Sequence, residues 1–143
     1  MISDIPKRAG TKLSRDVIML VVVMMVNVLI IILLTPIGFE TRPQFDLETV
    51  GYIAIVSIFL GLALDLASIG LLFKRVRVRL ASSLAIVSSV LFLLIIFVDR
   101  TGSFFSVPIP PAINTLEYIF VVVIIVTLFL ASKVYRENKP TSN

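Results

Sequence analysis

The sequence predicts an all-α integral membrane protein with four transmembrane helices, and three observations lead to that prediction. Hydrophobic residues make up 58% of the 143 residues and charged residues only 15%, whereas a soluble domain carries roughly 45–50% and 25%. The apolar residues gather in four runs, each near the length of about 20 residues that crosses a bilayer. The connecting segments alternate between basic and non-basic. A water-soluble fold of this length cannot bury so much apolar surface, so lipid is the expected environment.

The four apolar runs differ in how they are interrupted and how they end. The first contains one amide, Asn27, and we expect its helix to break at residues 35–38, Thr-Pro-Ile-Gly. The second contains one charge, Asp65, and the third contains none. The fourth is expected to begin at a capping box formed by Asn114 and Glu117. We therefore expect one domain, residues 1–143, with spans at about 17–34, 50–73, 80–98 and 115–132.

The charges beside the spans predict the orientation of the chain. Residues 74–79 hold four Lys or Arg and no acidic residue, and the leading segment and the tail are also basic. The other two connections are acidic or nearly neutral. The positive-inside rule then favours an antiparallel bundle of two helical hairpins in the cell membrane, with both termini cytoplasmic (N-in/C-in). An alternative takes the first span as a secretory signal peptide, but its apolar run exceeds the usual 7–15 residues and 34–36 is a poor cleavage site.

Asp65 is the ionisable residue that lies deepest in a predicted span. A carboxylate at the bilayer centre costs about 2.5–3.5 kcal/mol on insertion scales, which suggests an ion or proton site. The structural alternative is a buried anchor that Lys133 neutralises by snorkelling, since the two residues differ by roughly 3 Å in expected depth. Both interpretations stay open at this point.

Small and polar residues follow helical spacing on three of the spans and predict helix packing. Ser57 and Gly61 precede Asp65 on one narrow stripe of the second span, where small residues at four-residue spacing let helices approach closely. Asn27 can donate and accept a hydrogen bond across helices. The predicted helix-packing residues are Asn27, Ser57, Gly61, Ser68, Ser82 and Ser89.

Two connections carry residues with a possible role at the membrane surface. The basic segment, with Lys74, Arg75, Arg77 and Arg79, is expected to contact anionic lipid headgroups, with an acidic partner as the alternative. The third connection is unusually apolar, and its Phe104 and Phe105 are expected to fold back onto the membrane interface. The alternative for these two residues is contact with a partner subunit.

The composition also narrows the function. The chain has no Cys and no His, so the usual ligands for zinc, copper, haem and iron–sulfur centres are missing, and we expect no metal and no cofactor. We find no nucleotide motif and no catalytic constellation, and we expect neither an enzyme nor a nucleic-acid binder. The favoured function is an accessory or scaffolding subunit of a larger membrane complex, bound to other membrane protein subunits or to itself. The alternative is a small oligomeric ion or solute transporter or channel with Asp65 as the coupling residue.

Overall fold

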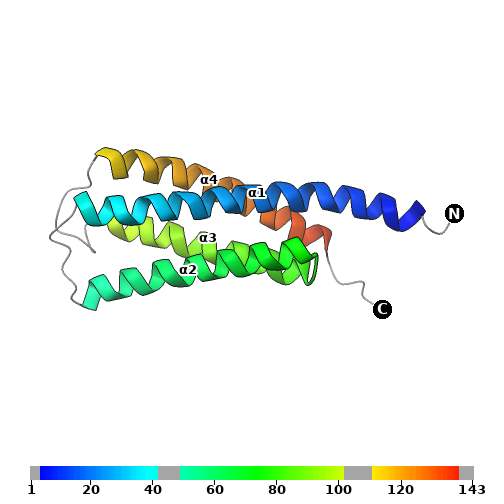
Figure 1. Cartoon of the computed structure of the whole chain (residues 1–143), viewed down its shortest axis with the longest axis horizontal. Helices are drawn as coiled ribbons and strands as arrows, with labels where there is room; N and C mark the ends of the chain where they lie inside the picture. The colour runs from blue at the N-terminus through cyan, green and yellow to red at the C-terminus, as the bar shows by residue number, and fades with distance from the viewer. Residues whose placement is uncertain (1–3, 42–48, 102–110, 139–143) are drawn as a thin grey trace.

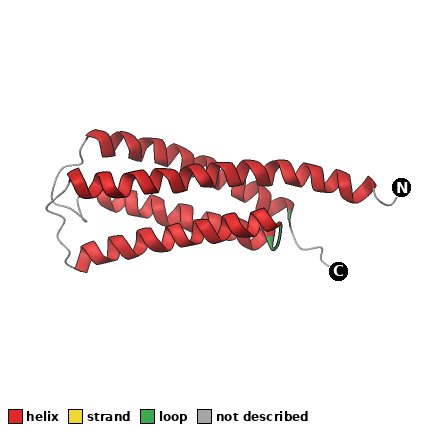
Figure 2. Cartoon of the chain, viewed as in Figure 1, coloured by secondary structure: helices red, strands yellow, loops and turns green. Residues whose placement is uncertain are grey.

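The structure, a computed structural model, describes residues 4–41, 49–101 and 111–138, with side chains described at 15–37, 52–101 and 111–138. These ranges form helices and contain no strand (Figure 2). Each helix includes a stretch that is long and apolar enough to cross a membrane. The prediction of four apolar helices is therefore confirmed, and the fold fits a small multi-pass membrane protein. The helices are α1 (Asp4–Thr41), α2 (Thr49–Lys74), α3 (Val78–Arg100) and α4 (Pro111–Glu137).

The four helices lie side by side with their axes roughly aligned (Figure 1). The most extensive contact joins α2 to α3, and α4 packs against both α3 and α1, while the α1–α2 contact is the smallest of the four. The helices therefore close a ring around a shared interior. Gly61 on α2 contacts Phe92 on α3. Ser68, which comes later in α2, contacts Ala81, which comes earlier in α3.

Two hydrophobic clusters fill this interior at different levels. The first lies toward the end of the bundle that holds the α2–α3 turn and the end of α4, and the second lies toward the other end (Figure 1). Because lipid tails are as apolar as these side chains, close van der Waals packing rather than removal from water holds such helices together. The buried members of the first cluster are Val17, Leu20, Val21, Met24, Leu72, Ala81, Ala85, Leu130, Ala131 and Val134. Those of the second are Ile30, Ile31, Phe92, Ile96, Phe120 and Ile124.

Helix α1 continues through the residues where the sequence predicted a break. Pro36 lies inside the helix, which ends only at Thr41. Proline removes one backbone donor, but in membrane helices neighbouring Ser or Thr side chains help to satisfy the freed backbone groups. Thr35 Oγ1 donates to the carbonyl oxygen of Ile31 at 2.8 Å, next to the Ile32 carbonyl that loses its backbone donor at Pro36. The predicted end of the first helix at residue 34 is therefore wrong, because local sequence signals of helix termination are weaker than the demand for internal hydrogen bonds.

Helix α4 begins before the predicted capping box. It starts at Pro111, where the missing N–H costs nothing because first-turn donors have no helical partner. Asn114 and Glu117 therefore lie inside the helix, and the predicted start at 115 is wrong. Thr115 Oγ1 donates back to the carbonyl oxygen of Pro111 at 3.1 Å, which binds the first turn together.

The turn between α2 and α3 spans residues 75–77 and ends α2 in a defined way. Arg75 N donates to Leu72 O and Val76 N to Leu71 O, both at 3.1 Å. This is the Schellman pattern, in which a residue with positive φ follows the helix end. Arg75 (φ 54°) and Arg77 (φ 49°) both adopt that conformation. The tight turn holds α2 and α3 in their extensive contact.

Candidate functional site

A layer of buried polar side chains separates the two hydrophobic clusters, and every helix contributes to it. Along each helix the polar residue falls between members of the two clusters or just beside them, as Asn27 does between Met24 and Ile30. All the members are at most 2% exposed. We call this set the central polar layer. It consists of Asn27 from α1, Asp65 from α2, Ser88 and Ser89 from α3, and Thr127 from α4.

Asp65 is held on one side by α3. Its Oδ1 accepts a hydrogen bond from the hydroxyl of Ser88, which also lies 3.1 Å from the carbonyl oxygen of Ala85. Its Oδ2 is fully buried and has no hydrogen-bond partner among the described residues. A buried carboxyl oxygen without a donor is costly, because the group has lost its water and gained nothing in return.

Asn27 joins α1 to α4 at the same layer. Its Nδ2 donates to Thr127 Oγ1 at 2.8 Å, and that hydroxyl donates in turn to the carbonyl oxygen of Val123 at 2.8 Å. Hydrogen bonds of this kind between membrane helices contribute about 0.6 kcal/mol on average. The amide oxygen of Asn27, Oδ1, is buried and has no hydrogen-bond partner in the described part of the chain.

Asn27 and Asp65 lie at one level of the bundle. Ser68 Oγ lies 3.5 Å from Met24 Sδ, which aligns α1 and α2 at these two residues. Asn27 follows Met24 by three positions, and Asp65 precedes Ser68 by three, so each lies about 4.5 Å from that contact in the same direction. Two buried acceptor oxygens without donors therefore occupy the same level on neighbouring helices.

The predicted helix-packing residues mostly face the interior. Ser68 donates to the carbonyl oxygen of Ala81 at 2.7 Å, so α2 approaches the backbone of α3. Gly61 packs against the ring of Phe92, where a Cβ would lie 2.5 Å from Cζ. Ser82 bonds within its own helix, to the carbonyl oxygen of Val78 at 2.9 Å. Ser89 is buried with no partner for its hydroxyl among the described residues, and Ser57 is half-buried.

Lys133 pairs with a different carboxylate from the one that the sequence suggested. Its Nζ lies 3.5 Å from Asp16 Oδ1 at the end of the bundle near the α2–α3 turn. The expected partner, Asp65, instead accepts from Ser88. Depth along the membrane allowed either pairing, but the side of α4 on which Lys133 lies faces α1 rather than α2.

The basic segment does not act as one unit. Lys74, Arg75 and Arg77 are exposed beside the α2–α3 turn, where headgroup contact remains open to them. Arg79 turns inward instead: its Nη2 donates to Tyr135 Oη at 2.9 Å, and its Cζ lies 4.4 Å from the centroid of that ring. Arg79 thus ties α3 to α4 as a cation–π and hydrogen-bonding partner. Phe104 and Phe105 lie outside the described residues.

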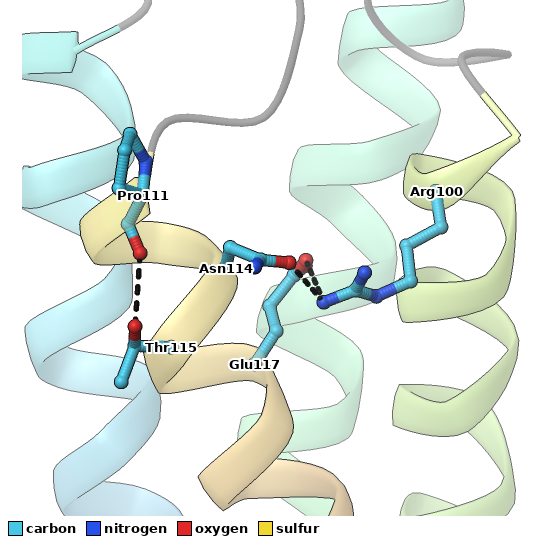
Figure 3. A network of polar contacts seen from close by, with 5 residues as sticks. All are labelled: Arg100, Pro111, Asn114, Thr115 and Glu117. Atoms are coloured by element: carbon cyan, nitrogen blue, oxygen red, sulfur yellow. Dashed lines mark hydrogen bonds and ion pairs between the residues drawn. The ribbon is translucent and has the colours of Figure 1, made fainter.

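A second polar cluster lies at the opposite end of the bundle, as Figure 3 shows. Arg100 from α3 donates through Nη2 to Asn114 Oδ1 at 2.8 Å and lies 4.0 Å from Glu117 Oε1 on α4. The guanidinium carbon also lies 4.5 Å from the centroid of the Tyr118 ring. The residues predicted to cap α4 therefore bind α3 to α4.

Sequence reasoning missed Thr127 and Arg100 as partners in these clusters, and it placed Ser88 near the depth of Asp65 without identifying it as the partner. Ser88 and Thr127 carry hydroxyls inside apolar runs, which is the one signal that points to them, but such hydroxyls commonly bond to their own helix. Their roles follow from which helix each one faces.

Comparison with protein-family models, with curated proteins and with solved structures finds no match for this chain.

Proposed function

We propose that the protein is a non-enzymatic accessory or scaffolding subunit of a larger membrane complex. In this proposal the helices form an antiparallel bundle of two hairpins in the cell membrane, with both termini cytoplasmic. The observation that carries the proposal is a face of α2 that the bundle leaves uncovered. The small residues that the sequence analysis assigned to packing largely serve contacts within the chain, so a partner requires a different surface.

That surface lies on the outward side of α2. Ala63, Ala67 and Gly70 are all exposed, and their spacing places them within about 60° of one another around the helix. Apart from the adjoining residues and backbone of its own helix, no atom lies within 4 Å of a Cβ built on Gly70. The span on α2 also buries the smallest share of its residues among the four. We call Ala63, Ala67 and Gly70 the outer α2 face. Small residues at this spacing allow a second membrane helix to approach closely.

Substitution of Ala67 with phenylalanine tests this role. If a helix of another subunit packs on the outer α2 face, the bulky ring separates the helices and costs about 1–3 kcal/mol, which is a loss of roughly 5- to 150-fold in affinity. We expect the partner recovered with the wild-type protein in mild detergent to be lost with Ala67→Phe, as quantified by mass spectrometry of the intact complex.

The matched control is Val122→Phe, because Val122 is 61% exposed on α4 and lies away from the outer α2 face. That variant should retain the partner. Retention of the partner by Ala67→Phe, or recovery of the wild-type chain only as a monomer or homodimer, would contradict the proposal.

The proposed orientation rests on where the basic residues gather. One end of the bundle holds the α2–α3 turn and the end of α4 (Figure 1). The basic residues at that end are Lys74, Arg75, Arg77, Lys133 and Arg136. The positive-inside rule assigns that end to the cytoplasm.

Because the chain has no cysteine, single introduced cysteines report the orientation without background. In intact cells, a membrane-impermeant maleimide should label Thr101→Cys and leave Arg77→Cys unlabelled until the membrane is permeabilised. The reverse pattern would overturn the assignment.

The central polar layer favours a second candidate function, ion- or proton-coupled transport. A carboxyl group 1% exposed in the middle of an apolar bundle, with one oxygen unpartnered among the described residues, is unusual for a purely structural element. Intramembrane carboxyl groups commonly mark ion and proton pathways. In this candidate function Asp65 is the coupling residue, and the protein acts as an oligomer because four helices rarely enclose a pathway alone.

A further inference from the structure

Two buried acceptor oxygens of the central polar layer have no hydrogen-bond donor among the described residues. Asp65 Oδ2 and Asn27 Oδ1 are both buried, both without a hydrogen-bond partner among the described residues, and both at one level of neighbouring helices. Two acceptor oxygens at close range repel each other unless a donor lies between them. One N–H of the Asn27 amide donates to Thr127, and the Ser88 hydroxyl donates to the other oxygen of Asp65. The Ser89 hydroxyl, on the next residue of α3, has no partner among the described residues.

We propose that the central polar layer is a proton-binding site, in which Asp65 is a neutral carboxylic acid and its Oδ2 donates to Asn27 Oδ1. The added hydrogen completes one chain of hydrogen bonds across all four helices. It runs from the Ser88 hydroxyl to Asp65, from Asp65 to Asn27, from Asn27 to Thr127, and from Thr127 to the carbonyl oxygen of Val123. Each named oxygen of Asp65 and Asn27 then has a partner, and the hydroxyls of Ser88 and Thr127 each donate to an acceptor.

No charged or titratable side chain faces Asp65 from the described parts of the neighbouring helices. Helix α1 presents Met24 and Asn27 at this level, α3 presents Ser88, and α4 presents Thr127. The charged groups of the interior lie at the two ends of the bundle. Arg79 is nine residues from Ser88 along α3, or about 13 Å, and Glu117 is ten residues from Thr127 along α4, or about 15 Å. A carboxylate at Asp65 would have no counter-charge, whereas a carboxylic acid needs none.

The proton also joins the two halves of the bundle. Without it, the layer holds α2 to α3 through Asp65 and α1 to α4 through Asn27. The smallest helix contact, between α1 and α2, then has an acceptor without a described partner on each of its two helices at this level. Release of the proton therefore weakens the α1–α2 contact, and binding restores it. The inference rests on the second candidate function above and names its ligand, because proton-dependent opening between two halves is what a proton-coupled carrier requires.

Infrared difference spectroscopy on the protein in lipid nanodiscs tests the proton directly. At neutral pH the wild-type protein should show the C=O stretch of a protonated carboxyl group, and Asp65→Asn should lose that band. Asparagine is nearly isosteric and its amide can still donate to Asn27 Oδ1, so this variant should keep its fold. Glu117→Gln is the matched control, because it removes the other carboxyl group that is buried among the described side chains, beside Arg100, and should leave the band in place.

Asn27→Leu tests the acceptor, and Asn27→Ala replaces it if the leucine variant does not fold. Loss of the acceptor weakens the hydrogen bond from Asp65, so the carboxyl band should move to higher wavenumber. A wild-type spectrum in which Asp65 contributes only carboxylate bands overturns the proposal, and a band unmoved by both Asn27 variants overturns the shared hydrogen bond. A band that behaves as expected in a protein without proton flux refutes the transport function and leaves the proton-binding site standing.

Discussion

Gly61→Leu is expected to destabilise the bundle by about 1–3 kcal/mol, the usual cost of overpacking a filled core. A Cβ at Gly61 lies 2.5 Å from Cζ of Phe92 and 2.9 Å from its Cε2. The ring has little freedom to move away, because Phe92 and Phe120 are each 3% exposed and their ring centroids lie 5.4 Å apart. The loss should appear as a lower free energy of unfolding in an SDS titration from mixed micelles.

Gly70→Leu is the matched control for this prediction. Gly70 lies on the same helix, and nothing lies within 4 Å of its Cβ position, so leucine there should leave stability unchanged or raise it slightly through better helix propensity. Phe92→Ala in the Gly61→Leu background should recover part of the loss, since the two sites share one space. Equal effects at Gly61 and Gly70 would show that the contact with Phe92 does not limit the packing of α2 on α3.

Asp65→Asn is expected to abolish proton flux in proteoliposomes if the second candidate function holds. The amide can accept the hydrogen bond from Ser88 and donate toward Asn27, so the closed arrangement of helices is retained. The amide cannot take up and release a proton, so no group at position 65 can carry the proton through the transport cycle. The measurement is the rate of pH change inside vesicles after a potassium diffusion potential is applied.

Glu117→Gln should keep most of the flux, because Glu117 lies at the end of the bundle, 4.0 Å from Arg100. This comparison separates loss of one particular carboxyl group from loss of negative charge in general. Flux that survives Asp65→Asn would exclude Asp65 as the coupling residue, whatever its state of protonation.

Asp65 and Asn27 show how far the residues alone could lead toward the site. Both stand out as polar residues inside apolar runs, and hydrophobic surroundings make any such residue seek a partner. The depth of Asp65 in the membrane did not predict which residue it would bond to. Lys133 and Ser88 both lay near the expected level of Asp65, but the rotation of α4 directs Lys133 to Asp16 and the close α2–α3 contact brings Ser88 to Asp65.

Helix ends were misjudged for a related physical reason. Pro36 and the pair Asn114 and Glu117 carry strong local signals for a break and a cap. In the structure α1 passes through Pro36, and the two α4 residues contact Arg100 across the helix interface. Contacts with Arg100 offset the capping preference of Asn114 and Glu117, which is worth roughly 1 kcal/mol. At Pro36 the demand for internal hydrogen bonds opposes a local cost of about 3 kcal/mol.

The amino-acid sequence by itself determined that this protein forms four apolar helices, because long runs without charge can satisfy their backbone only within a helix once water is absent. It also determined that Asp65 and Asn27 lie among apolar residues. The tertiary structure alone decided that these two residues meet in one layer with a hydroxyl from each of the other helices. That depends on how each helix is rotated about its axis, and rotation is set by the packing of Gly61, Phe92 and the two hydrophobic clusters rather than by the pattern along any single helix.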